Sequence, residues 1–134
     1  MQDRPDINSL LEAVQDFLIK EVMPAVKDSD SLSYKTLVSW NMLGVIGREV
    51  KLGEKSSFIE LERLKKILSQ EDVSVSSLSH SERLILSGRL NQMLSEKIRK
   101  EKISIENREI WNAVKQGLSE KLEIANPKFS TGDA

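Results

Sequence analysis

Apolar residues recur at spacings of three and four along most of this sequence, and that spacing constrains the fold more than any other feature. Five segments show the spacing, whereas no stretch of four or more residues alternates between apolar and polar side chains as a half-buried strand does. Since an α-helix turns once every 3.6 residues, side chains at these spacings share one face. We therefore predict an all-α fold, a bundle of about five helices joined by short loops.

The expected helices begin and end at residues that favour helix ends. Asp6 and Asn107 are expected N-caps, and Ser79 with Glu82 matches a capping box. Gly53 is expected to end the second helix, because glycine is common just beyond a helix C-terminus. These signals give helices at about 7–22, 33–52, 55–69, 80–102 and 108–125, with loops at 28–33 and 70–79.

The second expected helix is apolar on more than one side, at Leu37, Val38, Met42, Leu43, Val45, Ile46 and Val50. A helix of this kind belongs at the centre of a bundle. Gly44 and Gly47 lie in the same helix, and their low helix propensity indicates that a neighbouring backbone packs closely there. In the third helix, the apolar stripe leaves Glu60 and Lys65 facing water.

The length and the net charge of the chain limit the number of domains and the classes of partner that we expect. The 134 residues suffice for a single helical domain (1–134), with a core at about 6–126 and a carboxyl-terminal tail at 127–134. The chain holds 20 Lys and Arg residues against 21 Asp and Glu residues, a net charge of −1. General nucleic-acid binders and proteins held on anionic membranes carry a basic excess on one face, so we expect no nucleic-acid and no membrane partner.

The sequence lacks the residues that several kinds of functional site require. Without cysteine, disulfides, thiolate metal ligands and Cys nucleophiles are excluded. The single histidine cannot supply the paired Glu-x-x-His ligands of a di-iron bundle, so we expect no metal and no cofactor. We find no signal peptide, and the most apolar stretch, Leu37 to Val50, is too short to span a bilayer. We therefore expect a cytoplasmic protein.

His80 is the one side chain whose ordinary pKa lies near neutral pH, which suits a general base. It directly follows Ser79 at a helix start, however, and Glu82 is the one carboxylate in an evident orienting position. We expect no catalytic residue, and an enzyme that uses His80 is a third hypothesis.

Polar residues interrupt the most apolar helix at Asn41 and Arg48. They are seven residues apart, two helical turns along a face that also holds Tyr34. We expect Asn41 to be buried and hydrogen-bonded, with Arg48 as its neighbour, because an unpaired buried amide costs about 1 to 3 kcal/mol. These three residues form either an internal hydrogen-bond network or the polar contacts of a ligand pocket.

Aromatic residues are the candidate anchors for a partner protein. Trp40 and Phe129 are the first candidates, and Trp111 is a further one. The Asn126-Pro127 turn is expected to redirect the chain over the fifth helix. We therefore expect Phe129 to dock on the bundle and Trp111 to be the more buried tryptophan.

Three groups of residues follow one another in the order of a family pattern. The first is Arg4-Pro5, Leu10-Leu11-Glu12-Ala13-Val14, Phe17-Leu18 and Glu21-Val22-x-Pro24-Ala25; the second is Tyr34, Val38-Ser39-Trp40-Asn41 and Arg48-Glu49-Val50; the third is Lys121-Leu122-Glu123-Ile124-Ala125-Asn126-Pro127-Lys128-Phe129. In these residues, from Arg4 to Phe129, the chain resembles a bacterial domain family of unknown function. It departs from the family pattern at Lys35 and Leu37, where a His and an Arg are expected.

The resemblance implies a partner enzyme rather than a catalytic activity of the chain itself. Members resemble partners of aminoglycoside-phosphotransferase-like kinases and of acyl-CoA-dehydrogenase-like enzymes, and no activity is attached to the family. Our leading hypothesis is therefore a noncatalytic accessory or protein-interaction domain for such an enzyme. The alternative is a helical bundle that binds a small acyl or phosphorylated ligand, and a homo-oligomer stays open in either case.

Overall fold

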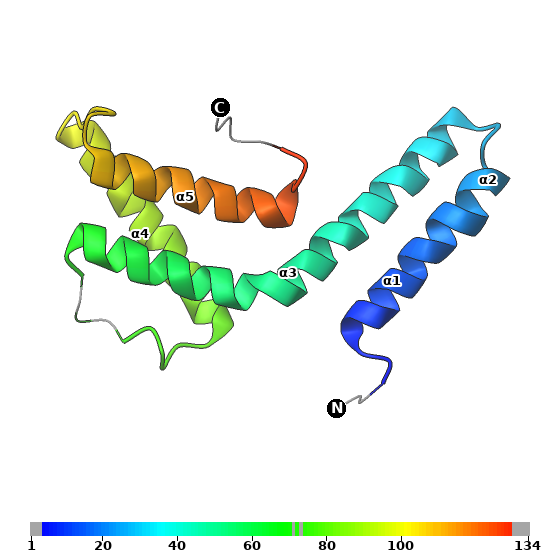
Figure 1. The fold of residues 1–134 in the computed structure, drawn as a ribbon, viewed down its shortest axis with the longest axis horizontal. Coiled ribbons are helices and arrows are strands. Elements are labelled where there is room, and N and C mark those ends of the chain that lie inside the picture. The colour runs from blue at the N-terminus through cyan, green and yellow to red at the C-terminus, as the bar shows by residue number, and fades with distance from the viewer. Residues whose placement is uncertain (1–3, 71, 73, 130–134) are drawn as a thin grey trace. The chain divides into compact units, whose positions relative to one another are not determined.

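The computed structural model of the protein describes residues 4–70, 72 and 74–129, and every regular element in them is helical. The elements are α1 (Ile7–Phe17), a π-helical turn (Leu18–Val22), α2 (Met23–Ala25), α3 (Asp30–Leu68), α4 (His80–Lys100) and α5 (Arg108–Ala125), as Figure 1 shows. The all-α prediction is confirmed. Residues 130–134 of the expected tail lie outside the described residues. None of the described helices has the length and apolarity needed to cross a membrane.

Within the described residues, four main helices stand in place of the predicted five, because the second and third join into the 39-residue α3. Gly53 is buried within α3 and does not end it. The helix ends at Leu68, where Ser69 takes a left-handed φ of 54°. The amide of Gln70 then donates to the carbonyl of Lys65 at 2.9 Å and closes the last turn.

The predicted N-caps are confirmed. Asp6 Oδ1 accepts from the amide three residues on at 2.8 Å, and Asn107 Oδ1 does the same at 3.2 Å. Ser79 and Glu82 form the capping box, in which the Ser79 amide donates to the Glu82 carboxylate at 2.8 Å and the Glu82 amide donates to Ser79 Oγ at 3.3 Å. The start of α3 differs from the prediction, because residues 30–33 are helical rather than part of a loop.

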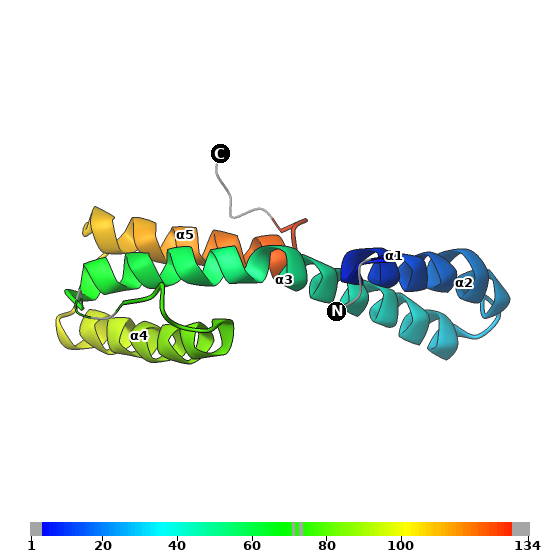
Figure 2. The ribbon, with the colours of Figure 1, turned by 90° about the horizontal axis from the view of Figure 1, so that it is seen from below.

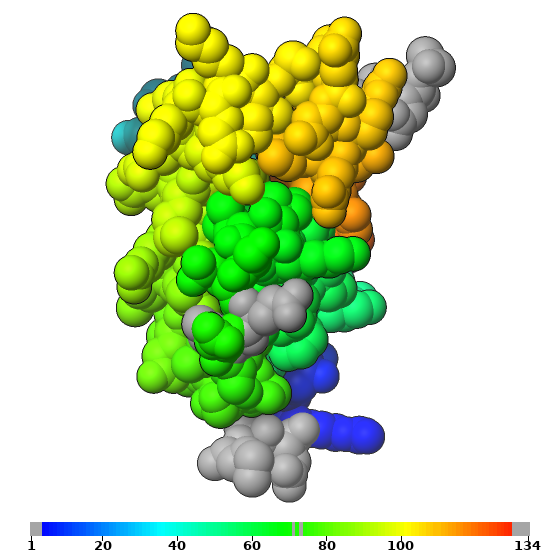
Figure 3. Space-filling model, turned by 90° about the vertical axis from the view of Figure 1, so that its left-hand side faces the viewer, coloured from blue at the N-terminus to red at the C-terminus, as the bar shows by residue number. Residues whose placement is uncertain are grey.

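The chain divides into two compact units, an N-terminal unit of Met1–Leu52 and a C-terminal unit of Gly53–Ala134. In the C-terminal unit, the second half of α3 packs with α4 and α5 (Figure 1, Figure 2). Figure 3 shows the end of α3 against α4 and the beginning of α5. The core of this unit consists of the buried side chains of Leu61, Leu64, Val75, Leu90, Leu94 and Ile110.

The N-terminal unit is an antiparallel hairpin of α1 and the first part of α3 (Figure 1). Pro24 lies in α2, beyond the π-helical turn, and the first helical segment ends one residue after it, at Ala25. None of the described hydrophobic side chains of this unit is buried, and Met42 is 58% exposed. Two helices bury only the strip between them, so a helix that is apolar on several sides leaves the others open. The central position predicted for this helix is therefore not confirmed.

Candidate functional site

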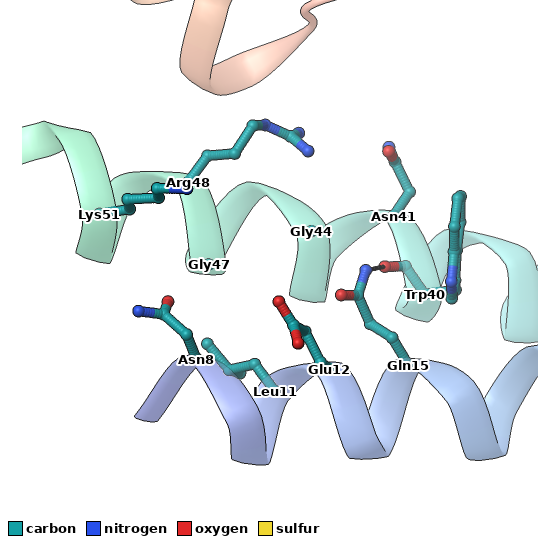
Figure 4. A pocket seen from close by; sticks show the side chains of 10 residues that line it. All are labelled: Asn8, Leu11, Glu12, Gln15, Trp40, Asn41, Gly44, Gly47, Arg48 and Lys51. Atoms are coloured by element: carbon teal, nitrogen blue, oxygen red, sulfur yellow. Dashed lines mark hydrogen bonds between the residues drawn. The ribbon is translucent and has the colours of Figure 1, made fainter. Parts of the chain in front are cut away.

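A pocket between α1 and α3 holds two of the three polar residues that were predicted to form a network or a ligand pocket (Figure 4). Asn41 and Arg48 line this pocket, which has a cavity volume of about 400 Å³. Tyr34 does not line it and is 69% exposed. The pocket lies wholly within the N-terminal unit, and its further lining side chains are Asn8, Leu11, Glu12, Gln15, Trp40 and Lys51.

Two glycines of α3 line the pocket, and side chains of other residues lie close to them. A Cβ atom on Gly44 would lie 3.1 Å from Nε2 of Gln15 and 3.2 Å from Nη1 of Arg48. A Cβ atom on Gly47 would lie 3.8 Å from a leucine side chain of α1. The close neighbours of these glycines are therefore side chains rather than the backbone that the sequence predicted. Nε2 of Gln15 also donates to the carbonyl of Trp40 at 3.0 Å, which fixes its amide in the wall.

Asn41 is exposed, so the prediction that it is buried was wrong. The prediction assumed that neighbouring helices would cover every side of the apolar helix, and the hairpin leaves this side open. Arg48 is half-buried, and Figure 4 shows its guanidinium and the Asn41 amide on the same side of α3, over Gly44. The two residues thus share a surface pocket rather than an internal network.

The charges around the pocket favour an anionic ligand group. Arg48 and Lys51 supply two cationic groups, and Glu12 supplies one carboxylate. The amides of Asn8 and Asn41 add hydrogen-bond donors. A guanidinium together with amide donors can hold a phosphate or a carboxylate through several hydrogen bonds. The arrangement therefore has the side-chain chemistry of a site for a phosphate or carboxylate group.

His80 contacts a serine in the C-terminal unit, but the geometry does not suit catalysis. The Ser57 hydroxyl donates to the carbonyl of Glu54 at 2.9 Å. Nδ1 of His80 lies 3.4 Å from the same hydroxyl oxygen, so we assign Nδ1 as the donor in this contact. A base that activates a serine must accept the serine proton. The contact therefore joins α4 to α3 and does not prepare Ser57 for attack.

Sequence reasoning missed a buried polar cluster around Glu60, which was expected to face water and is 9% exposed. Its carboxylate accepts hydrogen bonds from Ser87 Oγ, from Lys121 Nζ and, at 3.1 Å, from Asn91 Nδ2. Burial raises the pKa of Glu60, but these hydrogen bonds lower it by more, so the pKa lies below its ordinary value of 4.5. Ser87 and Asn91, four residues apart on α4, are the sequence signal that could have revealed the cluster.

A second pocket, of about 210 Å³, adjoins this cluster in the C-terminal unit. Its charged groups are paired within the chain. Arg63 donates to both carboxylate oxygens of Glu120, at 2.5 and 2.6 Å, and Lys121 donates to Glu60. Lys65, also expected to face water, is buried beside Glu62, with Nζ 3.3 Å from Oε1. The Arg63–Glu120 and Lys121–Glu60 pairs tie α3 to α5 and stabilise the unit, so this pocket is the weaker candidate for a ligand.

The aromatic residues are placed differently from the prediction. Phe129 is 57% exposed and does not dock. Trp111 is 44% exposed, whereas Trp40 is half-buried in the pocket wall, so Trp111 is the less buried tryptophan. On α5, Trp111 is followed on the same face by two further exposed apolar side chains, Val114 and Leu118.

The family called Domain of unknown function (DUF6285) matches residues 24–129, most of the chain. The chain belongs to this family. The expected resemblance to a domain family of unknown function is confirmed, and the predicted association with phosphotransferases or dehydrogenases is not shown. The DUF6285 match contains Asn41 and Arg48 and leaves α1, the other wall of the pocket, outside it. No curated protein and no solved structure shows significant similarity to the chain.

Proposed function

We propose that this DUF6285 protein is a noncatalytic protein-interaction domain that serves a phosphotransferase-like or acyl-CoA-dehydrogenase-like enzyme. The observation that supports the proposal is the exposed apolar row on α5, where Trp111, Val114 and Leu118 are 44%, 42% and 52% exposed. Exposed apolar patches rimmed by polar residues mark protein contacts, and tryptophan is enriched among the residues that dominate binding. The class of enzyme rests on the resemblance of the sequence.

Charge supports an apolar rather than an electrostatic contact. A net charge of −1 provides little long-range attraction for a partner. Affinity then has to come from an apolar centre, such as the α5 row, with a polar rim around it. Phe129, exposed just beyond α5, is a second aromatic side chain available to the same partner, whereas half-buried Trp40 offers less surface.

A binding assay with purified enzymes tests this proposal. The enzymes are a phosphotransferase-like and an acyl-CoA-dehydrogenase-like protein encoded next to the gene of this chain. We expect one of them to bind, and Trp111→Ala to weaken binding by tenfold or more at unchanged helicity, as truncation of an anchor does. Ile85→Ala is the matched control, because Ile85 is 75% exposed on α4. Binding by neither enzyme, or equal binding by the Trp111→Ala variant, would contradict the proposal.

The pocket of the N-terminal unit supports a second candidate function, the binding of a small phosphorylated ligand. The supporting observation is that Asn41, Arg48 and Lys51 line one pocket. Titration with coenzyme A and with a sugar phosphate, followed by NMR, tests it. We expect amide shifts at residues 40–51 for one of these ligands and their loss in Arg48→Ala. Shifts that persist in that variant, or none with either ligand, would remove this candidate.

A further inference from the structure

The hairpin of the N-terminal unit carries an apolar face on each of its two helices. On α1 the exposed apolar side chains are Ile7, Leu10, Val14 and Phe17, and on α3 they are Val38, Met42, Ile46 and Val50. Their exposed fractions run from 36% to 58%. Each set recurs at spacings of three or four and so forms a row along its helix. We call the two rows together the apolar face.

Both rows lie on the side of the hairpin opposite the pocket. Glu12 of the pocket is two residues from Val14, and Arg48 is two residues from Ile46. Two residues turn a helix by about 200°, so each row points away from the pocket. The pocket lies on one flank of the groove between the helices, and both rows therefore share the other flank.

The apolar face is expected to pack against another element of structure. None of the described hydrophobic side chains of the N-terminal unit is buried, so the hairpin has no core of its own. Short helices gain most of their stability from packing of an apolar face against another element. Two such hairpins, packed face to face, make a four-helix bundle with a shared apolar centre.

The charges at the ends of the α3 row indicate which molecule covers it. Lys35 and Glu49 lie seven residues before and after Met42, two helical turns away and on the same face of α3. Both are exposed, and neither makes an ion pair with another described residue. If a second α3 lies antiparallel with its Met42 opposite this Met42, each Lys35 meets Glu49 of the other copy. The row is thus complementary to itself in charge.

We propose that the apolar face binds a second copy of this chain, with a two-fold axis at Met42. The axis runs across the helices, so α3 lies antiparallel on α3 of the second copy and Val38 of each copy meets Ile46 of the other. Gln15, two residues before the end of α1, lies beside Gly44, which places the C-terminal end of α1 level with Met42. The same axis therefore sets this end of α1 antiparallel on the same end of α1 of the second copy. Such a symmetric interface uses one patch on both subunits.

Single-cysteine variants test the axis, because the natural chain has no cysteine. We expect the chain to sediment at twice its 15.2 kDa mass and Met42→Cys to give a covalent dimer with a short bismaleimide reagent. Leu37→Cys is the matched control, because Leu37 is 47% exposed on the other side of α3. A monomer, whether its face is bare or covered by another part of the chain, would overturn the proposal. Crosslinking at Leu37 in preference to Met42 would do the same.

Charge reversal tests the register and does not depend on crosslinking chemistry. Lys35→Glu or Glu49→Lys alone places like charges opposite one another and should weaken the dimer at low salt. The double variant Lys35→Glu with Glu49→Lys should restore the wild-type dissociation constant. Failure of the double variant to recover would refute the antiparallel register. Trp111→Ala should dimerise normally, so loss of enzyme binding and loss of the dimer report on the two proposals separately.

Discussion

Lys121 of α5 donates a hydrogen bond to the buried carboxylate of Glu60 on α3, and this contact joins two residues that lie 61 positions apart in the sequence. Ser87 of α4 donates to the same carboxylate, so one side chain connects all three helices of the C-terminal unit. A buried carboxylate is tolerated only when hydrogen bonds replace its water. The cluster is therefore a structural element, and removal of its central acceptor leaves buried donors unpaired.

The first prediction concerns Glu60. Glu60→Ala should lower the free energy of unfolding by about 1 to 3 kcal/mol, because Ser87 and Asn91 lose their buried acceptor. The measurement is urea unfolding at neutral pH. Glu123→Ala, at an exposed position on α5, is the matched control and should change stability little. Equal stability of the Glu60 and Glu123 variants would show that the cluster contributes nothing.

The second prediction gives the pH dependence of the same carboxylate. Because the folded pKa of Glu60 lies below its ordinary value of 4.5, the unfolded chain binds the proton more readily. The contribution of Glu60 to stability is therefore complete above about pH 4.5 and is lost as the pH falls through the lower folded pKa. Urea unfolding of the natural chain and of Glu60→Gln, from pH 7 downward, should show a difference that narrows below pH 4.5. A difference that widens there would reverse the sign of the shift.

The third prediction uses two glycines in helix interiors. Gly88 of α4 is exposed, and a Cβ atom there would have no neighbour within 4 Å. Gly88→Ala should therefore stabilise the protein by about 1 kcal/mol through helix propensity alone. A Cβ atom on Gly117 of α5 would lie 3.1 Å from Nη1 of Arg63, which Glu120 holds in place. Gly117→Ala should gain less than Gly88→Ala in thermal unfolding, and a larger gain would mean that Arg63 moves freely.

The fourth prediction separates capping from catalysis at the start of α4. Ser79→Ala should lower the free energy of unfolding by about 0.5 to 2 kcal/mol, because the Glu82 amide loses its acceptor. His80→Ala should leave enzyme binding unchanged. An activity that disappears in the His80 variant at unchanged melting temperature would establish a catalytic role for this residue instead.

Local signals in the sequence predicted local structure well. The caps at Asp6, Ser79 and Asn107 depend on residues within one helical turn, and all three were correct. The prediction that Gly53 ends a helix was wrong. Glycine favours a helix end only where the chain must turn, and here the helix continues through Phe58 and Leu61. No glycine lies at the end of α3, so the left-handed φ of Ser69 could not be predicted from the sequence.

Contacts between residues far apart in the chain could not be predicted from the sequence. Glu60 meets partners 27 to 61 residues away, and helical spacing says nothing about which faces of separate helices meet. The prediction that Asn41 is buried was wrong for the same reason. The apolar residues beside Asn41 were expected to belong to a core, but in the structure they lie exposed on the two-helix hairpin. Arg48 and Asn41 were nevertheless brought into one pocket, because two turns along one helix is a local relationship.

Hydrogen–deuterium exchange of the chain, with and without the enzyme that it binds, tests the interaction proposal most directly. We predict slower exchange of backbone amides along residues 108–125 when the enzyme is added, because the row of Trp111, Val114 and Leu118 becomes covered. Residues 80–100 of α4 provide the internal comparison and should exchange at the same rate in both states. Protection confined to α4, or exchange along α5 that the bound enzyme leaves unchanged, would contradict the proposal that this row is the contact surface.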